Sequence, residues 1–321
     1  MAGTTLAAVA ARSAMTVPMS ELVTADMPVD APLIAYCVGD GAPEGDVSAP
    51  PVPWWSVTKT CLAACALVLV DRGRLLLDAR LPDRACTLRQ LLQHTSGLGS
   101  YTERPDYRAA IERGDEPWTD AELSARVRLD PFLFEPGQGW SYSNTGYFLI
   151  RRLIERTADA DIDTALRTLV LSPLGIGETR IAREPADLDA CAWGNAGGYH
   201  PGWVFHGLLI GPPAEAALFM HRLLRGDLLS PSLRAAMLAR RALDGPLGGR
   251  PWRTAGYGLG VMMDVASPLG MCVGHSGQGH TVAATYHFFD LDPPRTVAAF
   301  APTTDPAAVE RAVLEAAARG K

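Results

Sequence analysis

Lysine is almost absent from this chain of 321 residues. Lysine and arginine together number 29, and only Lys59 and Lys321 are lysines. Arginine keeps its proton near neutral pH, whereas a buried lysine amine can lose its proton. Because the sequence supplies positive charge as arginine almost everywhere else, Lys59 marks a position that needs a titratable amine. Ser56 lies three residues before it and is the group that this amine would serve.

Other absences narrow the class of function. The net charge is −6 and no basic tract occurs, which argues against a protein that binds nucleic acid. The seven histidines are scattered and no His-Glu-x-x-His occurs, so we expect neither a metal site nor a cofactor. The six cysteines contain no Cys-x-x-Cys pair, and Cys61 and Cys65 are predicted to face the core. A small molecule or a short peptide is the expected substrate.

Two segments bear on membranes and location. Residues 62–77 are apolar but include Asp71, Arg72 and Arg74, so the run is too polar to span a bilayer and no membrane partner is expected. The N-terminus lacks the basic and continuous apolar stretches of a secretory signal, which predicts a cytoplasmic protein. A periplasmic or secreted location stays open, as does the oligomeric state.

The order of expected elements predicts an α+β fold. The pattern predicts a helix at 5–14, a strand at 33–38, a loop at 39–53, and helices at 56–71, 87–94, 120–129, 145–157, 162–171, 214–225 and 232–239. Strands follow at 256–264, 271–275, 282–289 and 296–301, and the last helix at 305–318. This order predicts an antiparallel sheet flanked by N- and C-terminal helices, with an inserted, mostly helical region. We assign residues 1–80 and 251–321 to the sheet region and 81–250 to the insert, as one two-lobed unit.

The first candidate motif is Ser56-x-x-Lys59 at the start of the expected helix. Residues three apart share one face of a helix, and the positive end of the helix dipole favours negative charge developing on the serine oxygen. The amine can relay the proton of Ser56 if burial lowers its pKa. A capping serine with a surface lysine is the simpler alternative.

The second candidate motif is Tyr142-Ser143-Asn144, which precedes an apolar helix. One interpretation is a turn in which Asn144 caps that helix. The other makes Tyr142 a phenolate-type base, with Lys59 as the cation that allows it to ionise, and Asn144 an amide that binds substrate.

The third candidate motif is Gly274-His275-Ser276-Gly277-Gln278-Gly279, between two expected strands. Small residues here would let a substrate approach backbone N–H groups closely. The rival interpretation is the nucleophile elbow Gly-x-Ser-x-Gly of an α/β-hydrolase. It fails because position 278 is Gln, a strand follows Ser276, and no Asp-then-His pair follows.

Together the three motifs resemble those of the serine β-lactamase and penicillin-binding protein superfamily. The closest branch contains the class C β-lactamases, D-alanyl-D-alanine carboxypeptidases, D-aminopeptidases and family VIII esterases. Residues 91–98, Pro136-Gly137 and residues 257–260 support the resemblance, which spans roughly 33–301. It implies the β-lactamase/transpeptidase-like fold.

The resemblance also implies a role for each motif residue. Ser56 would be the acylated nucleophile, and Lys59 and Tyr142 would share the proton transfers. Asn144 would bind the substrate's amide or carbonyl, and His275 would lie beside its leaving side or carboxylate, next to Gly277. The backbone N–H groups of Ser56 and Gln278 would form the oxyanion hole.

The third motif departs from one common family pattern, because His275 stands where Lys-Thr-Gly would supply a permanent cation. A histidine is only partly charged near neutral pH, so we expect weak hold on a substrate carboxylate. Hydrolysis of an amide, D-peptide or ester is the leading expectation. An acyltransferase using the same acyl-enzyme, or a penicillin-binding-like binder that does not hydrolyse, is the alternative.

Overall fold

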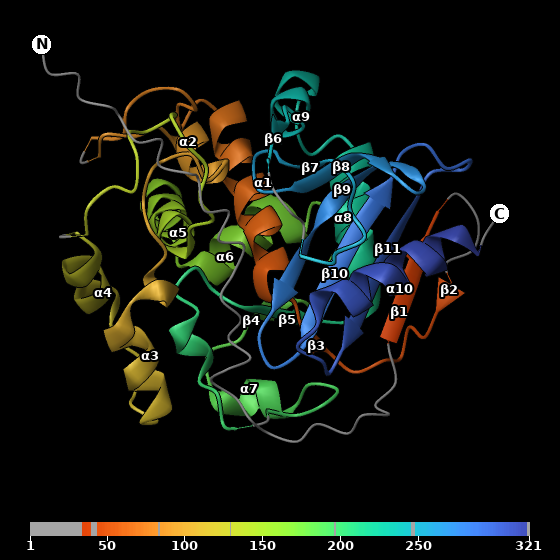
Figure 1. The fold of residues 1–321 in the computed structure, drawn as a ribbon, viewed down its shortest axis with the longest axis horizontal. Coiled ribbons are helices and arrows are strands. Elements are labelled where there is room, and N and C mark those ends of the chain that lie inside the picture. The colour runs from red at the N-terminus through yellow and green to blue at the C-terminus, as the bar shows by residue number, and fades with distance from the viewer. Residues whose placement is uncertain are drawn as a thin grey trace, which may run out of the picture.

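The main sheet is antiparallel. The computed structural model describes residues 34–39, 44–82, 84–128, 130–195, 197–244 and 248–319, so the helix expected at 5–14 lies outside it. In these ranges eight strands follow the order β2-β1-β11-β10-β9-β8-β7-β6 (Figure 1). Their bounds are β1 (Ile34–Val38), β2 (Glu44–Gly45), β6 (Arg241–Ala242), β7 (Ala255–Tyr257), β8 (Met262–Ser267), β9 (Gly270–Gln278), β10 (Val282–Phe288) and β11 (Arg295–Ala301).

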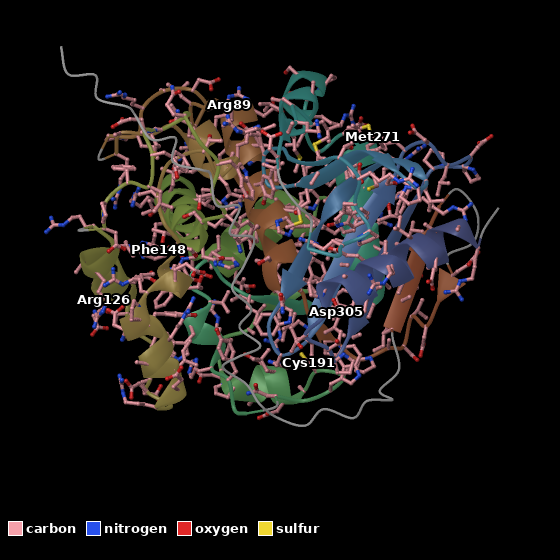
Figure 2. The ribbon with its side chains drawn as sticks, viewed as in Figure 1. Arg89, Arg126, Phe148, Cys191, Met271 and Asp305 are labelled. Atoms are coloured by element: carbon pink, nitrogen blue, oxygen red, sulfur yellow. The ribbon has the colours of Figure 1, made fainter. Side chains whose placement is uncertain are left out.

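Each face of this sheet is covered by a helix. Alternate residues of β10, such as Ala284 and Tyr286, join a buried cluster with Val313 of α10 (Pro306–Ala318). The opposite face packs against α8 (Pro213–Arg225). Asp305, labelled in Figure 2, caps α10 by accepting a hydrogen bond from the Ala307 N–H at 2.9 Å. The structure thus confirms the predicted antiparallel sheet and C-terminal helix.

The helix that begins just after Ser56 is the centre of the molecule. Twelve of the 14 residues of α1 (Thr58–Asp71) are buried, from Thr58 to Leu69. Its sequence is apolar around the whole circumference, as expected of a helix surrounded by protein. It packs against α5 (Asn144–Ala158) and α6 (Ile162–Leu166), which lie on the helical side of the sheet (Figure 1). Cys61 and Cys65 are buried in α1, as predicted.

The helical side differs from expectation in its short elements. The helix expected at 162–171 is α6 followed by the π-helical turn η4 (Arg167–Leu171). Helices α3 (Pro105–Glu112) and α7 (Pro185–Asp189) were not predicted, because each is too short to show a clear helical period. The other elements here are α2 (Leu88–Leu92), η3 (Tyr101–Glu103), α3 (Pro105–Glu112), α4 (Asp120–Val127), α7 (Pro185–Asp189), η5 (Pro201–Trp203) and α9 (Pro231–Met237). Every helix in the described ranges is too short or too polar to cross a bilayer.

The boundaries proposed for the two regions, at 80/81 and 250/251, stay a prediction. Helix α8 comes from the stretch assigned to the insert, yet it packs on β1, β10 and β11 of the sheet. Strand β6, from the same stretch, pairs with β7. The two regions therefore share one packed core.

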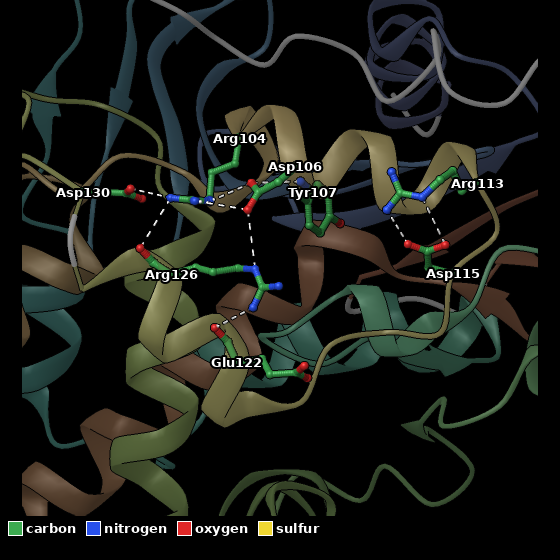
Figure 3. A network of polar contacts seen from close by, with 8 residues as sticks. All are labelled: Arg104, Asp106, Tyr107, Arg113, Asp115, Glu122, Arg126 and Asp130. Atoms are coloured by element: carbon green, nitrogen blue, oxygen red, sulfur yellow. Dashed lines mark hydrogen bonds and ion pairs between the residues drawn. The ribbon is translucent and has the colours of Figure 1, made fainter.

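A network of charged residues joins α3 to the end of α4 (Figure 3). The Arg104 guanidinium contacts both the Asp106 carboxylate, at 3.0 Å, and the Asp130 carboxylate. Arg126 of α4 reaches the Asp106 carboxylate at 3.5 Å. These partly exposed ion pairs hold the start of α3, which carries Tyr107 into the core, where its hydroxyl donates to the Trp203 carbonyl at 3.0 Å.

A small second sheet fixes the chain just before Ser56. Strands β3 (Val52–Pro53), β5 (Leu209–Gly211) and β4 (Arg180–Ile181) pair in that order. The Trp54 N–H then donates to the Leu209 carbonyl at 2.8 Å. The loop expected at 39–53 thus contains β2 and β3. Each has only two residues, too few to show a strand pattern: β2 pairs with the preceding β1, and β3 pairs with the distant β5.

Candidate active site

Ser56 lies in a tight turn of backbone between β3 and α1. It is the middle residue of the 3₁₀ turn η2 (Trp55–Val57), which leads directly into α1. Trp55 has φ of 44°, a left-handed conformation that is strained for a bulky residue. Its indole N–H donates to the Thr281 hydroxyl at 2.8 Å, which anchors the turn to the residue just before β10. The surrounding fold thus holds Ser56 in one position.

Lys59 and Ser56 meet as the spacing predicts. The Lys59 Nζ lies 3.0 Å from the Ser56 Oγ. Lys59 is fully buried, and burial lowers its amine pKa well below the usual value of 10.5. The alternative of a surface lysine is therefore wrong. A buried amine of lowered pKa beside a serine hydroxyl can accept the hydroxyl proton.

Tyr142 joins this pair, but not as an ionised base. The Lys59 Nζ lies 5.0 Å from the centre of the Tyr142 ring. Burial raises the pKa of Tyr142, and this effect exceeds the opposing effects of its hydrogen bond with Ser56 and of the charge on Arg250. The expectation that Lys59 would let Tyr142 ionise near neutrality is wrong, because burial favours the uncharged form of both groups. Tyr142 is a neutral hydroxyl that can donate or accept a proton.

The turn that carries Tyr142 is held by α2 and α5. Ser143, and not Asn144, caps α5, since its hydroxyl oxygen accepts from the Gly146 N–H at 3.0 Å. The Ser143 N–H donates to the His94 Nδ1 at 3.1 Å. Asn144 lines the pocket, and its side-chain NH₂ donates to the Ser100 and Thr102 hydroxyls at 3.1 and 3.3 Å. Its role in binding substrate stays a prediction.

His275 lies behind the pocket wall. It is fully buried, and its Nε2 contacts the Tyr257 hydroxyl at 2.9 Å while its Nδ1 contacts the Ser276 carbonyl at 2.6 Å. Because a carbonyl only accepts, Nδ1 carries the proton and Nε2 accepts from Tyr257. Burial, followed by the charge of Lys59, lowers the pKa of His275 to about 3. The expected partly charged contact with substrate is therefore replaced by a neutral side chain that holds Tyr257.

The end of β9 passes very close to Ser56. A Cβ added to Gly277 would lie 2.4 Å from the backbone nitrogen of Ser56, so only glycine fits there. The next residue, Gln278, lines the pocket, and its side-chain amide donates to the Thr304 carbonyl at 2.8 Å. This approach brings the two N–H groups expected in the oxyanion hole, those of Ser56 and Gln278, to the same end of the pocket. Their role stays a prediction.

His206 is a neighbour of Lys59 that the sequence did not indicate. Its Nε2 lies 3.1 Å from the Lys59 Nζ, across 147 residues of chain. His206 is 3% exposed, and burial, followed by the charge of Lys59, lowers its pKa well below the usual 6.5. No motif surrounds it, and its place follows from β5, which begins three residues later.

These residues border a cavity of about 300 Å³ with largely aromatic walls. Among the described residues, no three His, Cys, Asp or Glu side chains are grouped so as to hold a metal ion. The aromatic lining residues are Trp55, Tyr101, Tyr107, Trp140, Tyr142, Tyr199, Trp203, Trp252, Tyr257 and Tyr286.

Comparison with known proteins finds a matching family and similar chains. Residues 51–319 match the family described as Beta-lactamase. The chain is 24% identical over 299 residues to Penicillin-binding protein 4* of Bacillus subtilis, which covers 82% of this chain and 63% of that protein. It is 34% identical over 143 residues to Esterase EstB of Burkholderia gladioli, covering 38% of this chain and 36% of the esterase. The chain thus spans less than two thirds of both curated relatives.

The fold also matches a solved structure over nearly its whole length. A D-stereospecific amidohydrolase from Streptomyces superimposes with a TM-score of 0.74 at 25% identity. The superposition covers 88% of this chain and 92% of that one. The fold predicted from the motifs is therefore confirmed.

Proposed function

Because the chain belongs to the Beta-lactamase family, we propose that it is a serine hydrolase that forms an acyl-enzyme on Ser56. Its substrate is a small amide, D-peptide or ester. One observation carries the proposal: a fully buried lysine, of lowered pKa, has its Nζ 3.0 Å from the Ser56 Oγ. The similar proteins include an esterase and a D-stereospecific amidohydrolase, which supports the same class of chemistry.

The first half of the reaction acylates the serine. The Ser56 Oγ attacks the substrate's carbonyl carbon while the neutral Lys59 amine takes the hydroxyl proton. The carbonyl oxygen becomes negative and is stabilised by the backbone N–H groups of Ser56 and Gln278. Each such donor typically contributes roughly 10²–10³ in rate. As the carbon–oxygen or carbon–nitrogen bond breaks, the neutral Tyr142 hydroxyl protonates the leaving atom and recovers a proton from Lys59.

The second half releases the acyl group to water. A water molecule attacks the ester on Ser56, with Lys59 and Tyr142 again accepting and returning a proton. The product is a carboxylic acid, and the Ser56 hydroxyl is restored. The aromatic cavity walls supply apolar surface for the acyl group and exclude bulk water from the reacting atoms.

The test is covalent labelling combined with a substrate screen. A fluorophosphonate should add one phosphonyl mass to Ser56, and p-nitrophenyl esters, nitrocefin and D-amino-acid amides should be screened for turnover. Ser56→Ala should remove the label and lower turnover at least about 10³-fold. Ser48→Ala, at an exposed serine that does not line the cavity, is the matched control and should keep both. Absence of any adduct on Ser56 with several acylating probes would reject the proposal.

A further inference from the structure

The cavity is lined by both cationic and anionic side chains. Among the described lining residues the cations are Arg108 and Arg250, and the carboxylates are Glu112 and Asp264. Arg108 pairs with the Glu103 carboxylate at 2.9 Å. The sign of the charge that a substrate meets near Ser56 therefore depends on Arg250.

Arg250 is held by a buried carboxylate. Its Nε lies 2.8 Å from one carboxylate oxygen of Glu310, and one of its terminal nitrogens contacts the other oxygen. The two side chains thus form a bidentate ion pair. Glu310 lies on α10, is fully buried and does not line the cavity. The Arg250 side chain is 11% exposed. Arg250 therefore lines the cavity, and Glu310, which lies outside the lining, balances its charge.

Two neutral hydroxyls complete this cluster. The Ser276 hydroxyl donates to the Glu310 Oε1 at 2.5 Å and contacts the Tyr286 hydroxyl at 2.9 Å. Ser276 and Tyr286 both line the cavity, beside Gly277, which touches the backbone of Ser56. The Glu310 carboxylate thus accepts from two guanidinium nitrogens and a hydroxyl. Glu310 therefore keeps Arg250 neutralised in the free protein.

The remaining charges near the cavity add no cation. Asp264 accepts hydrogen bonds from the backbone N–H groups of Arg253, Thr254 and Ala266, between 2.6 and 3.1 Å, and from the Thr254 hydroxyl at 2.6 Å. Glu112 is exposed on the last turn of α3. Around the cavity, both arginines are matched by carboxylates, and two further carboxylates have no cationic partner in the described lining. A substrate carboxylate here would lose its water without gaining an uncompensated positive charge.

We propose that this site selects esters and amides that carry no carboxylate near the scissile bond, an inference that rests on the proposed hydrolase activity. Glu310 determines this specificity by acting through Arg250. The substrate class is thus uncharged esters and amides, and D-peptides that end in a free carboxylate next to the scissile bond are excluded.

The first test uses the unmodified protein and two isosteric esters. The 3-carbamoylphenyl and 3-carboxyphenyl esters of phenylacetic acid differ only in an amide against a carboxylate on the leaving group. We expect kcat/KM to be at least about tenfold higher for the carbamoyl ester, because like charge and lost hydration oppose the carboxylate. Equal rates, or a preference for the carboxylate, would overturn the proposal without any variant being made.

The second test changes the residue that neutralises Arg250. Glu310→Gln keeps the size of the side chain and releases the guanidinium charge, so the ratio of kcat/KM between the two esters should fall by at least about tenfold. Glu315→Gln makes the same charge change on the exposed face of α10 and should leave the ratio unaltered. A purely structural role of Glu310 would lower both rates and leave their ratio unchanged, which would contradict the proposal.

Labelling separates the two hypotheses. Fluorophosphonate titration of Ser56 counts the competent sites in each preparation, so rates are compared per labelled site. If Ser56 is not labelled in the unmodified protein, the proposed hydrolase activity fails. If Ser56 is labelled and the carboxyphenyl ester is cleaved as fast as the carbamoylphenyl ester, only the specificity proposal fails.

Discussion

At the scale of single residues, the environment of one amine decides the chemistry. The Lys59 Nζ has two polar neighbours, the Ser56 Oγ at 3.0 Å and the His206 Nε2 at 3.1 Å. A neutral amine has two hydrogens and one lone pair. If the neutral imidazole of His206 accepts one hydrogen, the lone pair is left free to face the serine hydroxyl. His206 would then orient the base without exchanging a proton with substrate.

This orientation predicts a specific defect in a His206 variant. His206→Phe fills the same space but cannot accept a hydrogen bond, so the amine can rotate away from Ser56. We expect kcat to fall by about tenfold to a hundredfold with KM changed much less. His206→Gln, which restores an acceptor, should recover part of the loss. Steady-state kinetics on a p-nitrophenyl ester checks this, and a raised KM with unchanged kcat would instead make His206 a substrate contact.

The sequence predicts some of these residues and not others. Ser56 and Lys59 meet because a spacing of three places them on one face of a helix, and this is visible in a linear pattern. His206 reaches Lys59 only through the tertiary fold, across 147 residues. The burial of His275, which makes it neutral, likewise depends on Tyr257 and the packing of β9, and no local pattern reveals it.

At the scale of elements, the site depends on how closely β9 approaches the turn before α1. Gly277 pairs with Ala283 of β10, so its position is fixed by the sheet register. On its other side, a Cβ added to Gly277 would meet the Ser56 nitrogen, the Trp55 Cβ and the Trp54 carbonyl oxygen. The sheet therefore sets the distance between the end of β9 and the nucleophile.

This contact predicts the effect of one added methyl group. Gly277→Ala would place a Cβ 2.4 Å from the Ser56 nitrogen, and the two backbone segments that carry these atoms are both held in place. We expect turnover to fall at least about a hundredfold and the free energy of unfolding to fall by about 1–3 kcal/mol. Gly99→Ala, whose Cβ would meet nothing closer than 4.0 Å, is the matched control. Comparing labelling rates and thermal unfolding of the two variants checks this, and equal behaviour would mean that β9 can move away freely.

The elements themselves could be predicted to different degrees. Strands β10 and β11 and helix α10 were predicted close to their observed bounds, because their patterns extend over seven residues or more. Strand β9, predicted at 271–275, continues to Gln278, because its last residues are polar or glycine and show no strand pattern. Strands of two or three residues, such as β3 and β5, have too little sequence to carry a pattern. They are nonetheless the elements that place Trp54 and hence Ser56.

At the scale of the whole molecule, burial lowers the pKa of five of the seven histidines. Burial lowers the pKa of His94, His206 and His275, all around the site, and of His280. On the far part of the sheet, burial and then the charge of His221 lower the pKa of His287 to about 3. The same burial that lowers the pKa of Lys59 thus creates groups that the unfolded chain would protonate more readily.

This burial predicts that stability falls as the solution becomes mildly acidic. Below the unfolded histidine pKa of 6.5 the unfolded chain takes up protons that the folded protein does not. The free energy of unfolding therefore falls with decreasing pH, by up to about 1.4 kcal/mol per pH unit for each such histidine. Urea unfolding at about pH 7.5, 6.5 and 5.5 measures the slope. His287→Gln keeps a hydrogen-bonding side chain for the Thr296 hydroxyl but does not titrate, so its slope should be smaller by about one proton. A stability independent of pH in this window, or an unchanged slope in His287→Gln, would show that these side chains become protonated within the folded protein.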